Sequence, residues 1–162
     1  MEEIKRITSF TVNHERLRPG FYVSRRDGDV NTYDLRTRTP NAGDYMDNIS
    51  MHSVEHMFAT FARNSQYAEH VIYFGPMGCR TGFYFLMRDV SDREAYELTK
   101  EILEKVLEYE GPVFGASPME CGNYRELDLG AAKRECRRYL DALTAREESL
   151  GSKADVLFKY EE

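Results

Sequence analysis

The segment His52-Ser53-Val54-Glu55-His56 places two imidazoles and a carboxylate within five residues. Side chains four residues apart lie on the same face of a helix, so His52 and His56 can reach one divalent metal ion. Glu55 lies beside them and can move protons without being a ligand. The order H-x-x-E-H is the reverse of the zinc-peptidase motif H-E-x-x-H. The segment therefore predicts a metal site with an adjacent acid/base residue.

The residues around this motif have the spacing of an amphipathic helix over about 47–64. At 100° per residue, the histidines fall on one side, and the other side carries the apolar residues Val54, Met57, Phe58 and Phe61. Two histidines on an ordinary surface helix are the alternative interpretation. The glutamate between them and the cysteines downstream favour a metal site instead.

A catalytic metal normally has three protein ligands and one open position. Cys121 is the expected third ligand, because it lies in a loop between Pro118 and Gly122 and not on an apolar stripe. Cys136, by contrast, falls on the inward face of a predicted helix over 131–148. It is expected to pack in the core as a small hydrophobic residue.

Cys79 lies in a glycine-rich segment, 75–82, where a ligand can approach the backbone closely. The neighbouring Arg80 would favour its thiolate form. We therefore interpret Cys79 as an acid/base residue that acts opposite Glu55. The alternative makes Cys79 the third metal ligand and leaves Cys121 a structural role.

The composition is that of an ordinary globular protein, with 162 residues, 41% of them hydrophobic and 31% charged. The length predicts one domain over 1–162, with the tail after about 151 left open. A net charge of −6 argues against a nucleic-acid partner. We expect no signal peptide and no membrane span. Three cysteines without a C-x-x-C pair suggest the cytoplasm.

Hydrophobic periodicity predicts strands and helices in an order typical of an α+β protein. An antiparallel sheet with helices packed on one face follows from that order. The tail contains Val156-Leu157-Phe158, which the sequence leaves open as an added strand or a loose end. The expected strands are 4–13, 21–26, 30–38, 71–74 and 81–87, and the expected helices are 47–64, 91–110 and 131–148.

Five segments, in order over about residues 5–145, resemble the S-ribosylhomocysteine lyase (LuxS) family. The run Pro-Met-Gly-Cys-Arg-Thr-Gly-Phe-Tyr is the most specific of them. The matching segments are Ser9-Phe10-x-x-Asn13-His14, Asp34-Leu35-Arg36 with Pro40-Asn41, 52–59, 75–84 and 120–124.

The resemblance implies an α+β homodimer with two identical sites at the subunit interface. It implies Fe²⁺ as the native metal, with Zn²⁺ or Co²⁺ able to replace it, and no organic cofactor. It also implies a role for each matching residue. The metal ligands would be His52, His56 and Cys121, the acid/base pair Glu55 and Cys79, and the substrate-binding residues Ser9, His14 and Arg36.

The implied reaction cleaves the thioether of S-ribosyl-L-homocysteine. Two proton shifts move the sugar carbonyl from C1 to C3 through enediolates whose charge a divalent cation stabilises. A β-elimination then gives homocysteine and 4,5-dihydroxy-2,3-pentanedione, the precursor of the quorum-sensing signal autoinducer-2. The sequence departs from the family at Tyr73, Gly75 and Leu127, where aspartate, serine and histidine are usual. These changes concern how the amino-acid end of the substrate is held.

Two other functions are compatible with the motif alone. An inverse-zincin metallopeptidase would use Glu55 to activate water, with Glu120 or Glu126 as the third ligand. A non-enzymatic binding module would hold a structural metal in a closed shell of four ligands that includes Cys79. The cysteine at the expected third position favours the lyase over the peptidase.

Overall fold

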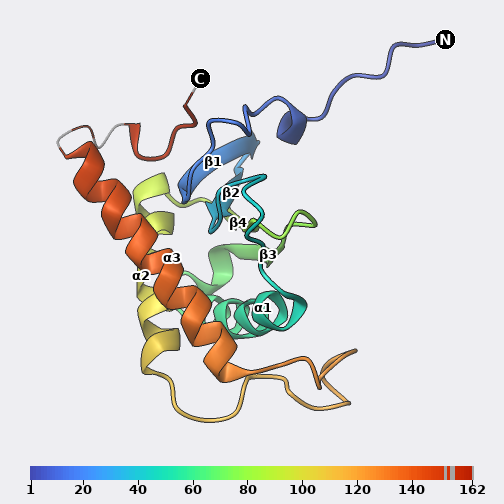
Figure 1. Ribbon diagram of the computed structural model, residues 1–162, viewed down its shortest axis with the longest axis vertical. Coiled ribbons are helices and arrows are strands. Elements are labelled where there is room, and N and C mark those ends of the chain that lie inside the picture. The colour runs from blue at the N-terminus through green and yellow to red at the C-terminus, as the bar shows by residue number, and fades with distance from the viewer. Residues whose placement is uncertain (152, 154–155, 162) are drawn as a thin grey trace.

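Four strands form one antiparallel sheet, in the order β1-β2-β4-β3 (Figure 1). The computed structural model describes residues 1–151, 153 and 156–161. The strands are β1 (Gly20–Asp27), β2 (Val30–Arg36), β3 (Val71–Pro76) and β4 (Gly82–Arg88). The longer helices are α1 (Asn48–Arg63), α2 (Asp92–Glu108) and α3 (Leu129–Leu150), and short 3-10 helices occupy Thr8–Phe10 and Ala68–His70.

The helices begin where the sequence supplies capping side chains. Asp47 accepts a hydrogen bond from the backbone N–H of Ser50 at the start of α1. Ser91 and Glu94 form a capping box at the start of α2. Asp128 caps α3, so this helix begins at Leu129, two residues before the predicted start at 131.

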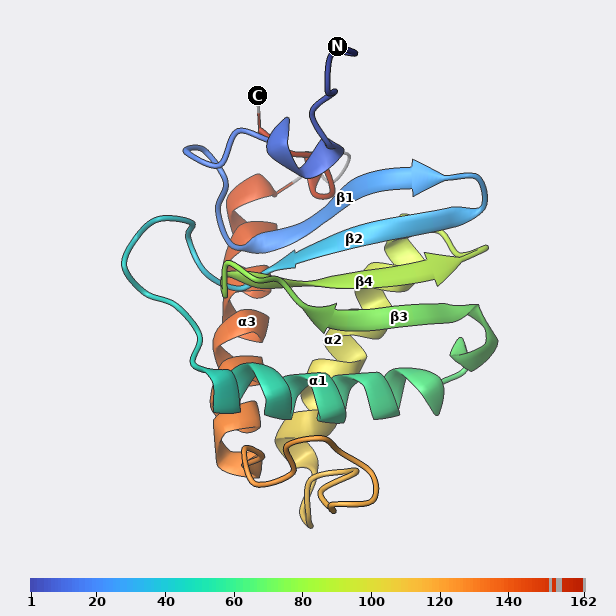
Figure 2. The ribbon, with the colours of Figure 1, turned by 90° about the vertical axis from the view of Figure 1, so that its right-hand side faces the viewer.

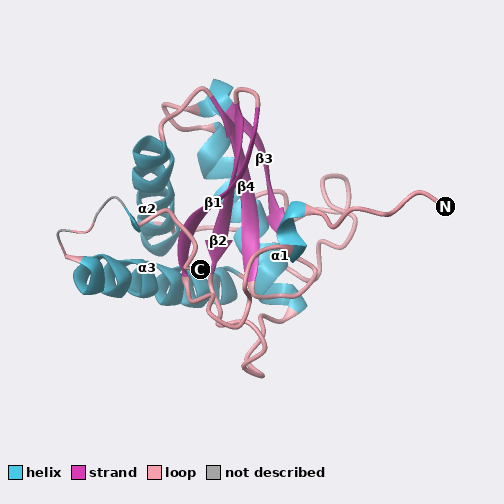
Figure 3. Cartoon of the chain, turned by 90° about the horizontal axis from the view of Figure 1, so that it is seen from above, coloured by secondary structure: helices cyan, strands magenta, loops and turns pink. Residues whose placement is uncertain are grey.

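The helices cover one face of the sheet, as expected from the sequence. In Figure 2, α2 and α3 lie behind the strands and α1 runs along the edge next to β3. Figure 3 shows α2 and α3 together on one side of the sheet. Aromatic side chains fill the space between the layers. Phe58 of α1, for example, stacks on Phe74 of β3 with the ring centroids 4.1 Å apart.

The opposite face of the sheet carries polar and aromatic side chains. Tyr22, Asp34 and Tyr84 are neighbours across β1, β2 and β4 in the strand register. Strand side chains alternate between faces, so these three point away from the core that Phe21, Leu35 and Phe85 form. The N-terminal segment lies against this face, and so does Tyr160 of the C-terminal tail.

The predicted strand over 4–13 is wrong. Only the 3-10 helix Thr8–Phe10 forms there, and Ile4, Ile7 and Phe10 are exposed. Its β-branched residues favour a strand only where a partner strand pairs with them, and no strand of the sheet pairs with this segment.

The tail forms no strand in the part that the structure describes, yet it is packed. Leu157 is buried, and the backbone N–H of Val23 donates to the carbonyl of Phe158 at 2.9 Å. The predictions for residues 152, 154, 155 and 162 lie outside the described residues. None of the described helices combines the length and the hydropathy needed to cross a bilayer.

Candidate functional site

His52, His56 and Cys121 converge, with their ligand atoms all within 4.8 Å of one another. The histidines project from successive turns of α1, and Cys121 comes from the loop between α2 and α3. The Sγ atom of Cys121 lies 3.3 Å from Nε2 of His52. The imidazole rings are nearly perpendicular, at 89°, with centroids 4.6 Å apart. Three donors therefore face a common point.

Backbone carbonyls orient both imidazoles. Nδ1 of His52 lies 3.0 Å from the carbonyl of Glu126, and Nδ1 of His56 lies 2.8 Å from the carbonyl of Phe114. A carbonyl oxygen only accepts hydrogen bonds, so Nδ1 carries the hydrogen and each Nε2 keeps its lone pair. This outer support is typical of histidines that bind metals. The donor set, two imidazoles and one thiolate, fits Zn²⁺ or Fe²⁺.

The loop that carries Phe114 depends on Gly115. Gly115 has φ +70°, a backbone conformation that favours glycine. A Cβ atom at this position would lie 3.1 Å from Nδ1 of His56 and would crowd the ring. The loop also orients the sulfur, because the N–H of Asn123 donates to Sγ of Cys121 at 3.4 Å.

Glu55 is half-buried on α1, beside the two histidines in sequence. It makes no hydrogen bond or ion pair with any residue that the structure describes, so its carboxylate is available to another molecule. The carboxylates proposed as peptidase-type ligands are placed differently. Glu120 accepts a hydrogen bond from Ser117, and Glu126 contributes its backbone carbonyl. Within the described residues, neither carboxylate joins the three-donor group.

Cys79 lies in a second site, an open pocket of about 380 Å³ on the face of the sheet opposite the helices. The three expected substrate-binding residues, Ser9, His14 and Arg36, line the same pocket. Nδ1 of His14 donates to the carbonyl of Val12 at 2.9 Å, so this bond orients the ring and does not use Nε2. Sequence reasoning thus selected four residues that the fold brings together.

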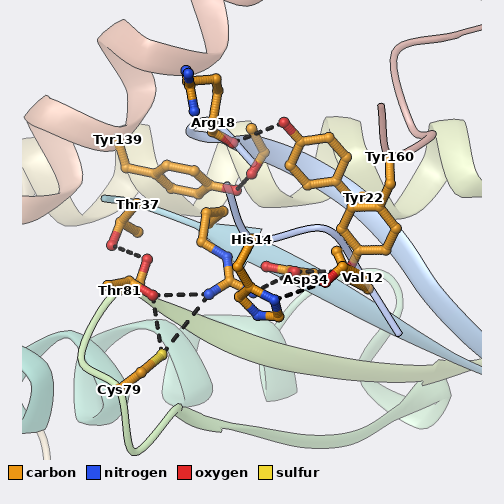
Figure 4. A network of polar contacts seen from close by, with 12 residues as sticks. Val12, His14, Arg18, Tyr22, Asp34, Thr37, Cys79, Thr81, Tyr139 and Tyr160 are labelled. Atoms are coloured by element: carbon orange, nitrogen blue, oxygen red, sulfur yellow. Dashed lines mark hydrogen bonds and ion pairs between the residues drawn. The ribbon is translucent and has the colours of Figure 1, made fainter. Parts of the chain in front are cut away.

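A buried arginine, Arg36 of β2, connects this pocket to the sheet. Its partners Asp34, Thr81 and Cys79 are labelled in Figure 4. Nη1 of Arg36 donates to the hydroxyl of Thr81 at 2.8 Å and lies 3.8 Å from Sγ of Cys79. The same sulfur lies 3.0 Å from the Thr81 hydroxyl. Nη2 donates to Oδ2 of Asp34 at 2.7 Å. Burial opposes the charge of Arg36, but its attraction to Asp34 leaves the pKa raised, so the guanidinium stays positive beside the thiol.

His52, His56 and Cys121 form a candidate metal-binding group. This metal-binding group and the Cys79 pocket are separate in this chain. The pocket lining includes neither Glu55 nor any of the three converging donors, and Cys79 is not one of those donors. The alternative in which Cys79 is the third ligand therefore does not match the geometry. Cys136 lies in the core, where burial raises the pKa of its thiol to about 12.

Three residues of the Cys79 network were missed from the sequence. The sequence contained a signal for Asp34, because a residue two positions before Arg36 lies on the same face of β2 and can contact it. The sequence also contained a signal for Thr81, which follows Cys79 by two residues in a turn. Tyr160 had none, since nothing local places a tail residue beside β2.

A family model described as S-ribosylhomocysteinase (LuxS) matches residues 7–149. The chain belongs to the LuxS family. It is 42% identical to the S-ribosylhomocysteine lyase of Borreliella burgdorferi (strain ZS7), over 91% of this chain and 98% of that protein. It is 43% identical to the lyase of Clostridium beijerinckii, over 85% and 91%, and 44% identical to that of Finegoldia magna, over 86% and 92%.

In this LuxS chain, Tyr73 and Gly75, two of the three positions expected to depart from the family pattern, are linked. A Cβ atom at Gly75 would collide with the phenol oxygen of Tyr73, so glycine leaves room for the tyrosine ring on β3. Tyr73 is half exposed and lines a second pocket, which shares Ser9 and Tyr84 with the Cys79 pocket. The third departure, Leu127, packs against the hydrophobic core.

Substitution of Cys121 tests the donor set directly. We expect Cys121→Ala to lower the affinity for Zn²⁺ by at least about 10-fold, because one of three converging donors is lost. Cys79→Ala serves as the matched control and should bind as the wild type does. The measurement is competition with a chromophoric chelator. Equal losses in both variants would contradict the separation of Cys79 from the metal.

Proposed function

We propose that this chain is an S-ribosylhomocysteine lyase, which converts S-ribosyl-L-homocysteine to L-homocysteine and 4,5-dihydroxy-2,3-pentanedione. The convergence of His52, His56 and Cys121, in a chain of the LuxS family, is the observation that carries the proposal. The curated relatives have the same activity in their names.

The same three side chains would hold the metal, and we propose Fe²⁺, with Zn²⁺ or Co²⁺ as substitutes. When bound, a divalent cation at this position supplies Lewis-acid chemistry toward the carbonyl and hydroxyl oxygens of the sugar. The proposed donors come from one helix and one loop, and both imidazoles have their Nε2 atoms free for it.

Proton transfer is the task of Glu55 and Cys79. The C5–S bond of the substrate is stable until a ketone at C3 makes the C4 proton acidic. Two proton shifts bring the carbonyl there, and removal of the C4 proton then expels the homocysteine thiolate. Glu55 makes no hydrogen bond or ion pair with any described residue, and the positive guanidinium of Arg36 lies beside the sulfur of Cys79, so both groups could exchange protons with the substrate.

The pocket around Cys79 would receive the substrate through Ser9, His14 and Arg36. The pocket offers a hydroxyl, an imidazole with a free Nε2 and a positive charge, which suit the hydroxyls and the carboxylate of the substrate. Tyr84 lines the same pocket and adds an aromatic surface.

We further propose a homodimer in which each site combines the metal-binding group of one copy with the Cys79 pocket of the other. Two features support it: the two groups do not share a pocket in one chain, and apolar Ile7, Phe10 and Tyr73 are exposed near the Cys79 pocket. Residues 1–162 would form one lyase domain. We place the enzyme in the cytoplasm, where its thiols stay reduced.

Removal of either proton-transfer group should abolish turnover without loss of the metal. We expect Glu55→Gln and Cys79→Ala each to lower kcat by about 10²- to 10⁴-fold, the range for general acid/base residues. The measurement is release of homocysteine from S-ribosylhomocysteine, followed with a thiol reagent, beside the metal content. The control, Glu97→Gln, changes an exposed carboxylate on α2. Full activity in both variants would refute the assignment, and chelator-sensitive peptide cleavage without thiol release would favour the peptidase.

Mixing the two inactive variants tests the shared site. In a symmetric dimer with composite sites, re-equilibrated Glu55→Gln and Cys79→Ala subunits form heterodimers with one intact site, so the mixture should recover about a quarter of wild-type activity. If each site lies within a single chain, every site keeps one substitution and the mixture stays inactive. Light scattering should report a dimer for each variant.

A further inference from the structure

The C-terminal tail extends beyond residues 7–149, the part of the chain that matches the family model. It nevertheless lies against β1. The carbonyl of Phe158 accepts a hydrogen bond from the N–H of Val23, and the ring of Phe158 packs edge-on against Phe21 with the centroids 5.8 Å apart. Leu157 is buried in the core. These contacts fix the path of the chain just before Tyr160.

Tyr160 reaches from the tail to the buried carboxylate of β2. Its hydroxyl donates to Oδ2 of Asp34 at 2.7 Å, and its ring stacks on Tyr22 at 4.8 Å between centroids and 17° between planes (Figure 4). Burial and the negative charge of Asp34 raise the pKa of the Tyr160 phenol, so the phenol remains a donor at neutral pH.

One carboxylate oxygen of Asp34 accepts two hydrogen bonds. Oδ2 accepts from Tyr160 and from Nη2 of Arg36, both at 2.7 Å, and only 2% of the Asp34 side chain is exposed. Its other oxygen, Oδ1, is buried and has no hydrogen-bond partner among the described residues. The orientation of this carboxylate therefore depends on two bonds, one of which comes from the tail.

Arg36 transmits that orientation to the pocket. Its Nη2 atom is held by Asp34, and its Nη1 atom points at Thr81 and at Sγ of Cys79. The guanidinium is planar, so fixing one terminal nitrogen also limits where the other can lie. Rotation of Asp34 would move the charge relative to the thiol.

We propose that Tyr160 is a positioning residue for Cys79, which acts through Asp34 and Arg36. The inference rests on the proposed function for the role of Cys79 in turnover, but not for the geometry of the network. It assigns to the tail, outside the family match, the task of holding a positive charge beside the reactive thiol. Tyr160 itself need not touch the substrate.

The test is Tyr160→Phe, which keeps the ring on Tyr22 and removes only the hydroxyl. The rate of alkylation of Cys79 by iodoacetamide at pH 7, without substrate, should fall by about 3- to 10-fold, because a displaced Arg36 stabilises the thiolate less. The alkylated peptide is quantified by mass spectrometry. Tyr67→Phe is the matched control, since Tyr67 also donates to a carboxylate, that of Glu94, away from this network. It should react as the wild type does.

A second comparison separates positioning from general loosening of the structure. In an Arg36→Met background, adding Tyr160→Phe should change the alkylation rate by less than about 2-fold, since the group through which Tyr160 acts is gone. All rates are measured well below the unfolding midpoint of every variant. The proposal is overturned if Tyr160→Phe reacts within 2-fold of the wild type, or if it slows alkylation equally with and without Arg36.

Measuring turnover beside the alkylation rates separates a failure of this inference from a failure of the proposed lyase activity. If the wild type releases homocysteine, kcat/KM of Tyr160→Phe should fall by the same factor as the alkylation rate, and an unchanged kcat/KM would overturn the role in catalysis. If the wild type does not turn over, the proposed function fails. The alkylation rates still decide whether Tyr160 positions Arg36 beside Cys79.

Discussion

Two hydrogen bonds from imidazole to backbone carbonyl determine what the metal-binding group can do. Each Nδ1 atom, of His52 and of His56, is fixed by a loop carbonyl, so both Nε2 lone pairs face Cys121. Those carbonyls belong to the connection between α2 and α3, which also supplies the cysteine. Helix α1 and this loop therefore form the group together, because the loop both orients the histidines and completes the donor set.

The second constraint is the burial of a charged pair on the other face of the sheet. Asp34 and Arg36 are each almost fully buried, and such charges persist only when they are paired and hydrogen-bonded. Nη1 of Arg36 donates to the hydroxyl of Thr81 and lies 3.8 Å from the sulfur of Cys79. The strand register places Asp34 between Tyr22 and Tyr84, and Tyr160 of the tail donates a hydrogen bond to its carboxylate. The chemistry of the pocket therefore depends on segments far from Cys79 in sequence.

Local patterns predicted the elements that carry their own signals. The H-x-x-E-H helix and the helix predicted from residue 91 are both present, and the resemblance selected His52, His56 and Cys121 together. The segment 4–13 failed because strand preference has no effect without a partner. Tyr160 and the carbonyls behind the histidines were beyond prediction, since their roles depend on tertiary contacts and not on residue type.

X-ray absorption by the zinc-loaded protein tests the central claim most directly. Two imidazoles and one thiolate at the metal predict a single sulfur neighbour at about 2.3 Å, two nitrogen neighbours from imidazole at about 2.0–2.1 Å, and one further light atom. In Cys79→Ala the spectrum should not change. Two sulfur neighbours, or a loss of sulfur in Cys79→Ala, would contradict the assignment of Cys121 as the only thiolate ligand and of Cys79 as a group free to move protons.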